Sequence, residues 1–302
     1  MPLAILPVRR SRVTSPPKPP LRAGEGEFTL LDVNVPEGDT IAQSAATLAG
    51  VLVGRAVTGF RSSVRGVEAR AAALGVVGSQ VAAVEARGKH LLIQFSGGAV
   101  LRTHMRMTGS WHLYRVGTRW RRPASLARAI VEAGDVVAVC FSAPEVELLS
   151  AGQMNGHAAL QRLGPDLLAP EFDEAEALAR LRAATDLEIA DALLDQSIAA
   201  GIGNVYKSEV LFLEGINPFA RVGSLNEETL RCLLRTARRQ LRRNVGVSER
   251  RTTHGTQKQT LWVYGRAGRP CARCGTTIRR AVQGPHARST YWCPTCQPQP
   301  LT

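Results

Sequence analysis

The chain has 302 residues, of which 44% are hydrophobic and 21% charged, and a net charge of +13 from 38 Lys and Arg against 25 Asp and Glu. This composition is typical of globular proteins and excludes wholesale disorder, and the length suggests about two domains. Uncharged stretches such as residues 40–54 and 71–84 are too short and too rich in Gly, Ser and Gln to span a bilayer, which needs about 20 apolar residues. We therefore expect no membrane partner.

The positive charge is confined to one end of the chain. Residues 1–220 hold 22 basic and 22 acidic side chains, whereas residues 221–302 hold 16 basic and 3 acidic ones. A basic surface concentrates polyanions around it. The alternative is a surface that only confers solubility, but the confinement to one region favours a nucleic-acid partner.

The first 35 residues differ from the rest. They contain a cluster of four prolines at positions 16–20, scattered arginines, no acid before Glu25 and no apolar periodicity, which predicts a disordered extension over residues 1–35. The apolar run at residues 3–8 is too short for the core of a signal peptide. A transit peptide and a segment that is never translated both remain open.

Residues 36–150 are predicted to form one helix followed by short strands. Ile41, Ala45, Leu48 and Leu52 share one face and predict a helix over residues 40–52. Apolar runs separated by Gly-bearing turns then predict strands over residues 81–86, 91–95, 100–104 and 136–141. We expect a β-rich unit with one early helix, followed by a helical unit.

The helical unit follows residue 150. Apolar spacing predicts helices over residues 172–184, 188–200, 205–213 and 226–243. The last is the strongest, and Ser224 with Glu227 resembles a capping box at its start. Its polar face carries Arg231, Arg235, Arg238, Arg239, Arg242 and Arg243. Such faces are usually only solvated, but proximity to the cysteine module described next favours a nucleic-acid contact.

Four of the six cysteines form two C-x2-C pairs, Cys271 with Cys274 and Cys293 with Cys296. This spacing is typical of a tetrahedral Zn²⁺ site, and two disulfides or free thiols are the alternatives. We predict one structural Zn²⁺ that folds the C-terminal segment and takes no part in chemistry, because four cysteines leave no open coordination position. Cys140 and Cys232 lie in apolar patterns and are predicted to be buried thiols.

Two further segments carry possible binding groups. Gly201 and Gly203 join two predicted helices, so this turn either brings backbone amides to a phosphate or only connects the helices. Met107 precedes a Thr-Gly turn, where it either packs in the core or fills the gap that an extruded base leaves.

Together these segments resemble the formamidopyrimidine-DNA glycosylase / endonuclease VIII family over residues 36–297. The carriers are Pro36-Glu37-Gly38-Asp39-Thr40, Arg87-Gly88-Lys89, residues 104–109, Leu163-Gly164-Pro165-Asp166, residues 193–206, residues 263–266 and the cysteine module. The resemblance implies an α+β fold: an N-terminal two-layer β-sandwich with flanking helices over residues 36–150, a helix-two-turn-helix bundle over residues 158–260 and a four-cysteine zinc-finger β-hairpin over residues 261–297.

The resemblance also implies a function, a bifunctional DNA glycosylase and abasic-site lyase acting on damaged DNA in base excision repair. Pro36 would be the Schiff-base nucleophile, Glu37 the proton donor, Lys89 the β-hairpin lysine and Arg288 the zinc-finger arginine. The implied DNA-binding residues are Asn204, Gly203 and the void-filling Met107. The start of the matched region leans towards the branch that removes oxidised pyrimidines. We expect a monomer in the bacterial cytoplasm, at the nucleoid.

Two features depart from the family pattern. Pro36 is internal, and an amide nitrogen cannot form an iminium, so we expect a misplaced start: Val35, as a GTG codon, would stand where the family has its initiator Met. Native protein should then yield a peptide beginning at Pro36. Second, residues 141–145 lack the Arg and Phe that help to fill the void in the formamidopyrimidine branch. A catalytically silent damaged-DNA-binding protein and a zinc-ribbon module without lesion specificity are the alternatives.

Overall fold

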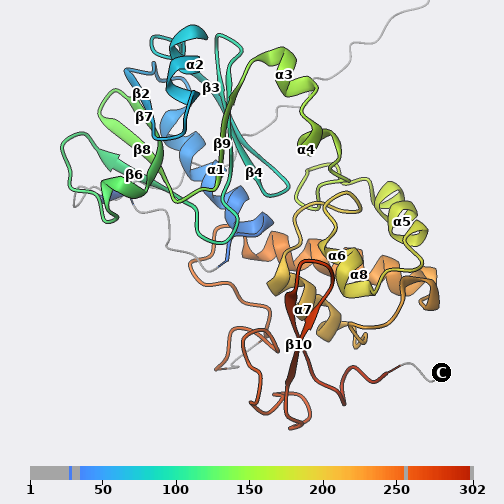
Figure 1. Cartoon of the computed structure of the whole chain (residues 1–302). Coiled ribbons are helices and arrows are strands. Elements are labelled where there is room, and N and C mark those ends of the chain that lie inside the picture. Colours follow the sequence, from blue (N-terminus) through green and yellow to red (C-terminus); the bar gives the residue numbers. More distant parts are fainter. Residues whose placement is uncertain (1–26, 29–34, 255–257, 300–302) are drawn as a thin grey trace, which may run out of the picture.

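The structure, a computed structural model, describes residues 27–28, 35–254 and 258–299. A β-sandwich forms one half of the molecule, and a helical bundle with a terminal β-hairpin forms the other (Figure 1). Helix α1 (Gly38–Leu52) begins where the two halves meet and runs into the sandwich. Among the described residues, none of the helices has the length and apolar character that a membrane crossing requires.

Two antiparallel sheets form the sandwich, with strand orders β1-β6-β8-β7-β2 and β3-β4-β5-β9. Their inner faces, α1 and the short helix α2 (Val67–Ala73) share one apolar core. The strands are β1 (Glu27–Phe28), β2 (Gly59–Ser62), β3 (Val81–Arg87), β4 (His90–Phe95), β5 (Val100–His104), β6 (Ser110–Arg115), β7 (Ala127–Ala133), β8 (Val136–Phe141) and β9 (Glu145–Leu149). This arrangement confirms the predicted α+β class and its sandwich.

The strands that the sequence analysis did not predict are those that mix charged with apolar residues or are very short. In β7 every second residue is buried, but the buried residues include three alanines and the outward positions include Arg128 and Glu132. The alternation is therefore weak in hydropathy although it is regular in space. Strands β2, β6 and β9 and helix α2 were missed for the same kind of reason, since each is short or mixes charged with apolar residues.

The bundle consists of small helices packed around one long one, and α5, α6, α7 and α8 share a second core. The helices are α3 (Ala151–Asn155), α4 (Ala158–Gln161), α5 (Glu174–Ala183), α6 (Ile189–Leu194), α7 (Asn204–Leu213) and α8 (Glu227–Asn244), with a 3₁₀ turn at Val222–Ser224; a second 3₁₀ turn, Ala124–Leu126, precedes β7 in the sandwich. In α8 the predicted apolar stripe is buried, while two acids lie in the first turn and two arginines in the last, as the helix dipole favours.

Two predictions in this half were wrong in detail. The helix predicted over residues 188–200 ends at Leu194, because the Asp195 carboxylate accepts hydrogen bonds from the backbone and hydroxyl of Ser197 and starts a turn. The capping box of Ser224 with Glu227 does not form. Instead Asn226 caps α8, and its side chain accepts a hydrogen bond from Thr229 at 2.8 Å.

Part of the arginine face of α8 binds protein, while Arg235, Arg239, Arg242 and Arg243 are exposed. Arg231 and Arg235 form ion pairs with Glu174 of α5 at 3.0 and 2.9 Å. The Arg238 guanidinium lies 5.1 Å from the centre of the Phe172 ring. This part of the face therefore joins two helices, which weakens the nucleic-acid interpretation of it.

The C-terminal hairpin pairs β10 (Arg279–Gln283) with β11 (Arg288–Trp292). A third small core under it contains Phe212 of α7, Trp262, Ile278 and two of the cysteines, so the hairpin packs on the bundle. Cys140 is fully buried in the sandwich, as predicted. The prediction for Cys232 was wrong: it is only half-buried, because it lies beside the apolar stripe of α8 near Glu228.

Most of the extension over residues 1–35 lies outside the described residues. Glu27 and Phe28 form β1 and pair with Tyr114 and Leu113 of β6. The prediction of disorder was wrong for these two residues, because the edge of β6 offers backbone groups that an extended segment can bind.

Candidate active site

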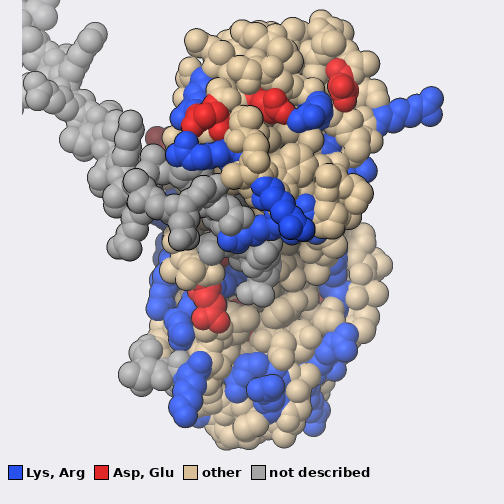
Figure 2. All heavy atoms as spheres, turned by 90° about the vertical axis from the view of Figure 1, so that its left-hand side faces the viewer, with Lys and Arg blue, Asp and Glu red and all other residues tan. Residues whose placement is uncertain are grey.

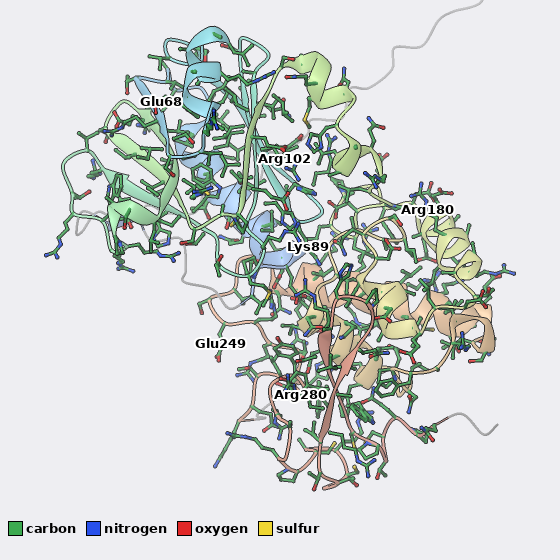
Figure 3. All side chains as sticks on the ribbon, in the orientation of Figure 1. Glu68, Lys89, Arg102, Arg180, Glu249 and Arg280 are labelled. Atoms are coloured by element: carbon green, nitrogen blue, oxygen red, sulfur yellow. The ribbon has the colours of Figure 1, made fainter. Side chains whose placement is uncertain are left out.

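A cavity of about 340 Å³ lies where the sandwich, the bundle and the hairpin meet. Every predicted catalytic and DNA-binding residue outside the cysteine cluster lines it: Pro36, Glu37, Lys89, Met107, Gly203, Asn204 and Arg288. They come from five segments that are far apart in sequence. In Figure 3, Lys89 lies between the two halves of the molecule.

Glu37 is held by the first turn of α7. Its carboxylate accepts hydrogen bonds from the backbone N–H groups of Gly203, Val205 and Tyr206 at 3.0, 2.7 and 3.2 Å. These amides have no partner within the helix, and the helix dipole favours an anion there. At the other end, Glu37 and Thr40 cap α1. The carboxylate is fully buried and has one fixed position beside Pro36.

The backbone amides at the turn before α7 therefore bind a carboxylate of the protein itself. A Cβ atom at Gly203 would lie 2.3 Å from the Glu37 Cδ atom, so the close approach requires glycine. The Gly203 amide, predicted as a DNA-binding group, is used by Glu37. Asn204 donates from Nδ2 to the Ser289 carbonyl at 2.8 Å, and its buried Oδ1 has no hydrogen-bond partner among the described residues. Asn204 thus joins α7 to the hairpin.

Lys89 projects from the tight turn between β3 and β4. Gly88 in this turn has φ +57° and donates to the Asp166 carboxylate at 2.6 Å, while Leu168 donates to the other oxygen at 2.8 Å. Asp166, from the segment after the sandwich, thus fixes the turn, a role that the sequence did not reveal. Burial lowers the pKa of Lys89 to about 8, with Arg288 and Arg250 adding to the effect against Glu37.

Met107 lies at an exposed turn rather than in the core. Its side chain is 51% exposed, and its Sδ atom lies 4.0 Å from the Arg288 guanidinium. The preceding Arg106 has φ +48° and donates through Nε to Glu145 at 2.8 Å, which holds the turn against β9. This exposure excludes the core alternative for Met107, and its role in filling the gap left by an extruded base stays a prediction.

The deep wall of the cavity carries a histidine pair that the sequence analysis did not single out. The rings of His90 and His104 lie 4.6 Å apart at the ends of β4 and β5. Burial, with the charge of buried Arg102, lowers the pKa of His90 to about 3, and burial lowers the pKa of His104 to about 4. Both imidazoles are therefore neutral near pH 7.

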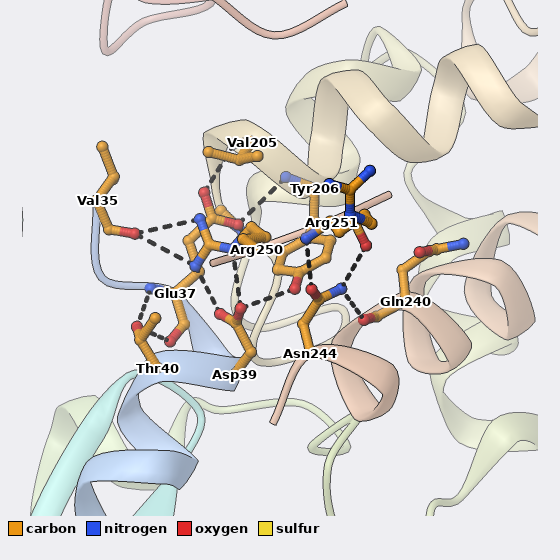
Figure 4. A network of polar contacts seen from close by, with 11 residues as sticks. Val35, Glu37, Asp39, Thr40, Val205, Tyr206, Gln240, Asn244, Arg250 and Arg251 are labelled. Carbon is orange, nitrogen blue, oxygen red and sulfur yellow. Dashed lines mark hydrogen bonds and ion pairs between the residues drawn. The ribbon is translucent and has the colours of Figure 1, made fainter. Parts of the chain in front are cut away.

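A buried ion pair of Asp39 and Arg250 lies next to Val35, the residue before Pro36 (Figure 4). Arg250 donates through Nε and Nη2 to the Asp39 carboxylate at 2.8 and 2.6 Å, and the Tyr206 hydroxyl donates to the same carboxylate at 2.8 Å. This pair could not be predicted from local patterns, because Arg250 lies in a segment without periodicity.

The four cysteines predicted as zinc ligands converge. All four Sγ atoms lie within 4.8 Å of one another, with 4.0 Å between Cys271 and Cys296 and 3.4 Å between Cys274 and Cys293. A tetrahedral ion with Zn–S bonds of about 2.3 Å requires sulfur atoms roughly 3.8 Å apart. The residues fit one structural Zn²⁺, which would fix the hairpin that carries Arg288.

The chain matches known proteins over its two halves and its hairpin. The formamidopyrimidine-DNA glycosylase N-terminal domain matches residues 35–147, the H2TH domain of that glycosylase residues 163–256, and the zinc finger found in FPG and IleRS residues 268–299. "Probable endonuclease 8 2" of Streptomyces coelicolor is 44% identical over 269 residues, which cover 88% of this chain and 95% of that protein. The chain belongs to the formamidopyrimidine-DNA glycosylase / endonuclease VIII family.

A second relative and a solved structure of the family are also similar to this chain. "DNA-(apurinic or apyrimidinic site) lyase Nei2" of Mycolicibacterium smegmatis is 41% identical over 264 residues, covering 87% of this chain and 99% of that protein. Formamidopyrimidine-DNA glycosylase of Lactococcus lactis, solved with DNA containing an abasic site, has the same fold with a TM-score of 0.75 at 24% identity, covering 87% of this chain and all of that one.

Removal of zinc from this family member should unfold the hairpin. Cys271 and Cys293 lie in the small core under it, so losing the metal removes the order of residues 268–297 and withdraws Arg288 from the cavity. We expect about one zinc per chain by metal analysis, and new protease-sensitive sites in the hairpin after chelation. Cys293→Ser should lose the zinc and Cys232→Ser should keep it. Full zinc content in the Cys293 variant would contradict the site.

Lys89 should make DNA binding sensitive to pH. Its ammonium is present below its pKa of about 8 and is lost as the pH rises through that value, so attraction to phosphate falls on the alkaline side. We expect affinity for duplex DNA with a tetrahydrofuran abasic-site analogue to fall by roughly tenfold more between pH 7 and pH 9.5 than it does in Lys89→Arg. Fluorescence anisotropy measures the DNA affinity of both proteins at each pH. Parallel pH profiles would show that Lys89 makes no such contact.

Proposed function

We propose that this chain is a bifunctional DNA glycosylase and abasic-site lyase of base excision repair, with oxidised bases, chiefly pyrimidines, as substrates. The observation that carries the proposal is the meeting of Pro36, Glu37, Lys89 and Arg288 in one cavity. Relatives named as endonuclease 8 and as abasic-site lyase support it. The basic character of the C-terminal region, visible in the lower half of Figure 2 where blue side chains far outnumber red ones, suits a DNA substrate.

We propose that the catalytic form begins at Pro36, with a free secondary amine. An α-amino group has a reference pKa of about 7.7–8.0, so a useful fraction is neutral near pH 7. The nitrogen bonds to C1′ of an extruded nucleotide as the bond from C1′ to the base breaks, and Glu37 provides the proton for the departing group. The sugar ring then opens: the C1′–O4′ bond breaks, O4′ leaves with the proton that the nitrogen loses, and an iminium remains at C1′ that acidifies the C2′ hydrogen. Loss of that proton expels the 3′ phosphate, and a second elimination expels the 5′ phosphate.

The binding groups around this centre have separate roles. Lys89 and Arg288 supply positive charge for the phosphates next to the lesion, and Asn204, the first residue of α7, binds the hairpin beside Arg288. Met107 fills the space that the extruded nucleotide leaves. We assign catalysis to residues 36–150, DNA binding to the helix-two-turn-helix region over residues 158–260, and phosphate contact to the zinc finger over residues 261–297.

The turn between β8 and β9 supports a preference for pyrimidines. It spans only residues 142–144, Ala143 is buried, and the Ser142 carbonyl accepts a hydrogen bond from Thr108. No long side chain projects from this turn to fill the void that the extruded nucleotide leaves in the duplex. This argues against 8-oxoguanine opposite cytosine as the main substrate. One chain supplies every wall of the cavity, so we propose a monomer, which acts on the chromosome in the bacterial nucleoid.

Product analysis tests the proposal. Protein beginning at Pro36 is incubated with duplexes that contain thymine glycol, dihydrouracil, 8-oxoguanine or a plain abasic site. We expect free base from the pyrimidine lesions and a strand break with phosphate at both ends. A catalytically silent protein on the same scaffold would bind these duplexes and leave every strand intact, and that outcome would reject the enzyme.

A further inference from the structure

The ion pair behind Pro36 has no part in the chemistry above. The Asp39 and Arg250 side chains are 2% and 3% exposed, and the Arg250 guanidinium lies 4.9 Å from the centre of the Tyr206 ring (Figure 4). Burial alone would lower the pKa of Arg250, but Glu37 and Asp39 hold it above its usual value, so the guanidinium stays charged. Removing two charges from water is costly, and such pairs often give little net stability.

The position of Arg250 is fixed from both sides. On one side Asp39 binds it with two hydrogen bonds. On the other, Asn244 at the end of α8 accepts from the Arg251 N–H at 2.7 Å and donates to the Arg251 carbonyl at 3.0 Å. The guanidinium is thus held at one place by both halves of the molecule.

That place is next to the nitrogen of Pro36. Both Nη atoms of Arg250 lie 3.4 Å from the Val35 carbonyl oxygen. This oxygen and the Pro36 nitrogen share one carbon atom, which places them about 2.3 Å apart. The guanidinium therefore lies within about 6 Å of the nitrogen, where a fixed positive charge acts strongly in a site with little water.

We propose that Arg250 is a positioning residue for the nucleophile: its tethered charge keeps the terminal amine of Pro36 in the neutral, reactive form. The inference rests on the proposed function, in which Pro36 is the first residue. Glu37 and Asp39 both follow Pro36 closely and would otherwise favour the ammonium form. Arg250 offsets Asp39, and the amide-rich first turn of α7 offsets Glu37.

The other groups that face the amine do not replace Arg250. His90 and His104 are neutral near pH 7, and Lys89 loses its own charge around pH 8. Arg102 and Arg106 bind Glu145 on the wall formed by the sandwich. Further charged or titratable groups around the cavity and its backing are Arg288, His286, Tyr206, Tyr264 and Lys207.

An NMR titration tests the inference without any catalytic readout. Protein beginning at Pro36 is labelled with ¹⁵N-proline, and the terminal proline is the one whose nitrogen titrates. We expect Arg250→Gln to raise the midpoint of that titration by about one pH unit, equivalent to roughly tenfold less neutral amine at acidic pH. Arg250→Lys should restore most of the shift, and Asp39→Asn should move the midpoint in the opposite direction.

The outcomes separate the inference from the proposed function. Opposite shifts in the Arg250→Gln and Asp39→Asn proteins support it, whereas unchanged midpoints or shifts in one common direction overturn it. If Arg250→Gln does not fold, the direction of the Asp39→Asn shift decides. In parallel, the acid limb of borohydride trapping on abasic-site DNA should follow the NMR midpoints. Midpoints that shift in opposite directions as expected, with no trapping by any variant, would reject the lyase and leave the electrostatic role of Arg250 intact.

Discussion

Protein that begins at Pro36 should become covalently attached to abasic-site DNA when borohydride is present, and the 302-residue chain should not. Borohydride reduces an iminium to a stable amine, and the Pro36 nitrogen can form that iminium with the sugar aldehyde only while it is a free secondary amine. In the longer chain the Pro36 nitrogen is an amide, whose lone pair is delocalised into the carbonyl. We expect at least a hundredfold difference in trapped protein by denaturing gel electrophoresis, with mass spectrometry locating the DNA on Pro36.

The matched control is a protein with a single Met retained before Pro36. It differs by one residue, keeps both halves of the cavity, and converts the amine to an amide. Pro36→Gly at the terminus should trap more slowly, because a primary amine replaces the constrained ring. Equal trapping by the Met-extended protein, with the DNA found on Lys89, would replace Pro36 by a lysine nucleophile.

Local patterns explain what could be predicted from the sequence. The cysteine spacing determines a metal site because each C-x2-C turn brings two sulfur atoms to one ion, whatever the surrounding fold. Helix α8 could be recognised because its apolar stripe repeats over several turns. The strands with unbroken apolar runs, such as β4 and β8, were found, whereas β7 was hidden by its alanines and charges.

The site residues are a harder case. Pro36, Glu37, Lys89 and Arg288 were chosen through the family resemblance, and periodicity alone gives no reason for them to meet. What joins them are contacts over long sequence separations: Glu37 with the amides of α7, and Asp166 with the turn that carries Lys89. Such contacts depend on how two folded halves dock, which no local pattern encodes. The pair of Asp39 with Arg250 was missed for that reason.

The interpretation of the Gly-x-Gly turn shows the limit most clearly. Free amides at a helix start are typical of a phosphate site, and the sequence could not reveal that a carboxylate from the first helix already occupies them. The glycine at position 203 is explained by steric contact with Glu37 rather than with a phosphate. The same residue pattern therefore supports a different chemistry once the partner is known.

The contact between Glu37 and the first turn of α7 makes Glu37 the residue whose replacement should reduce activity the most after Pro36. In protein beginning at Pro36, Glu37→Gln keeps the size and an oxygen for the α7 amides but removes the group that delivers a proton to the departing base. We expect release of a damaged pyrimidine to fall by roughly 10²- to 10⁴-fold. Trapping on a preformed abasic site should fall far less, since no base has to leave. Single-turnover assays on matched duplexes measure both steps.

Gly203→Ala provides a control that leaves Glu37 in the chain. The added Cβ atom would meet the Glu37 carboxylate and push it out of the α7 turn, so base release should again fall, although the acid is chemically intact. Glu37→Ala should in addition destabilise the protein by about 2–4 kcal/mol in urea unfolding, because three buried N–H groups lose their acceptor. If Gly203→Ala releases base at the normal rate, the position of Glu37 in that turn is not what catalysis requires, and the proton must come from another group of the cavity.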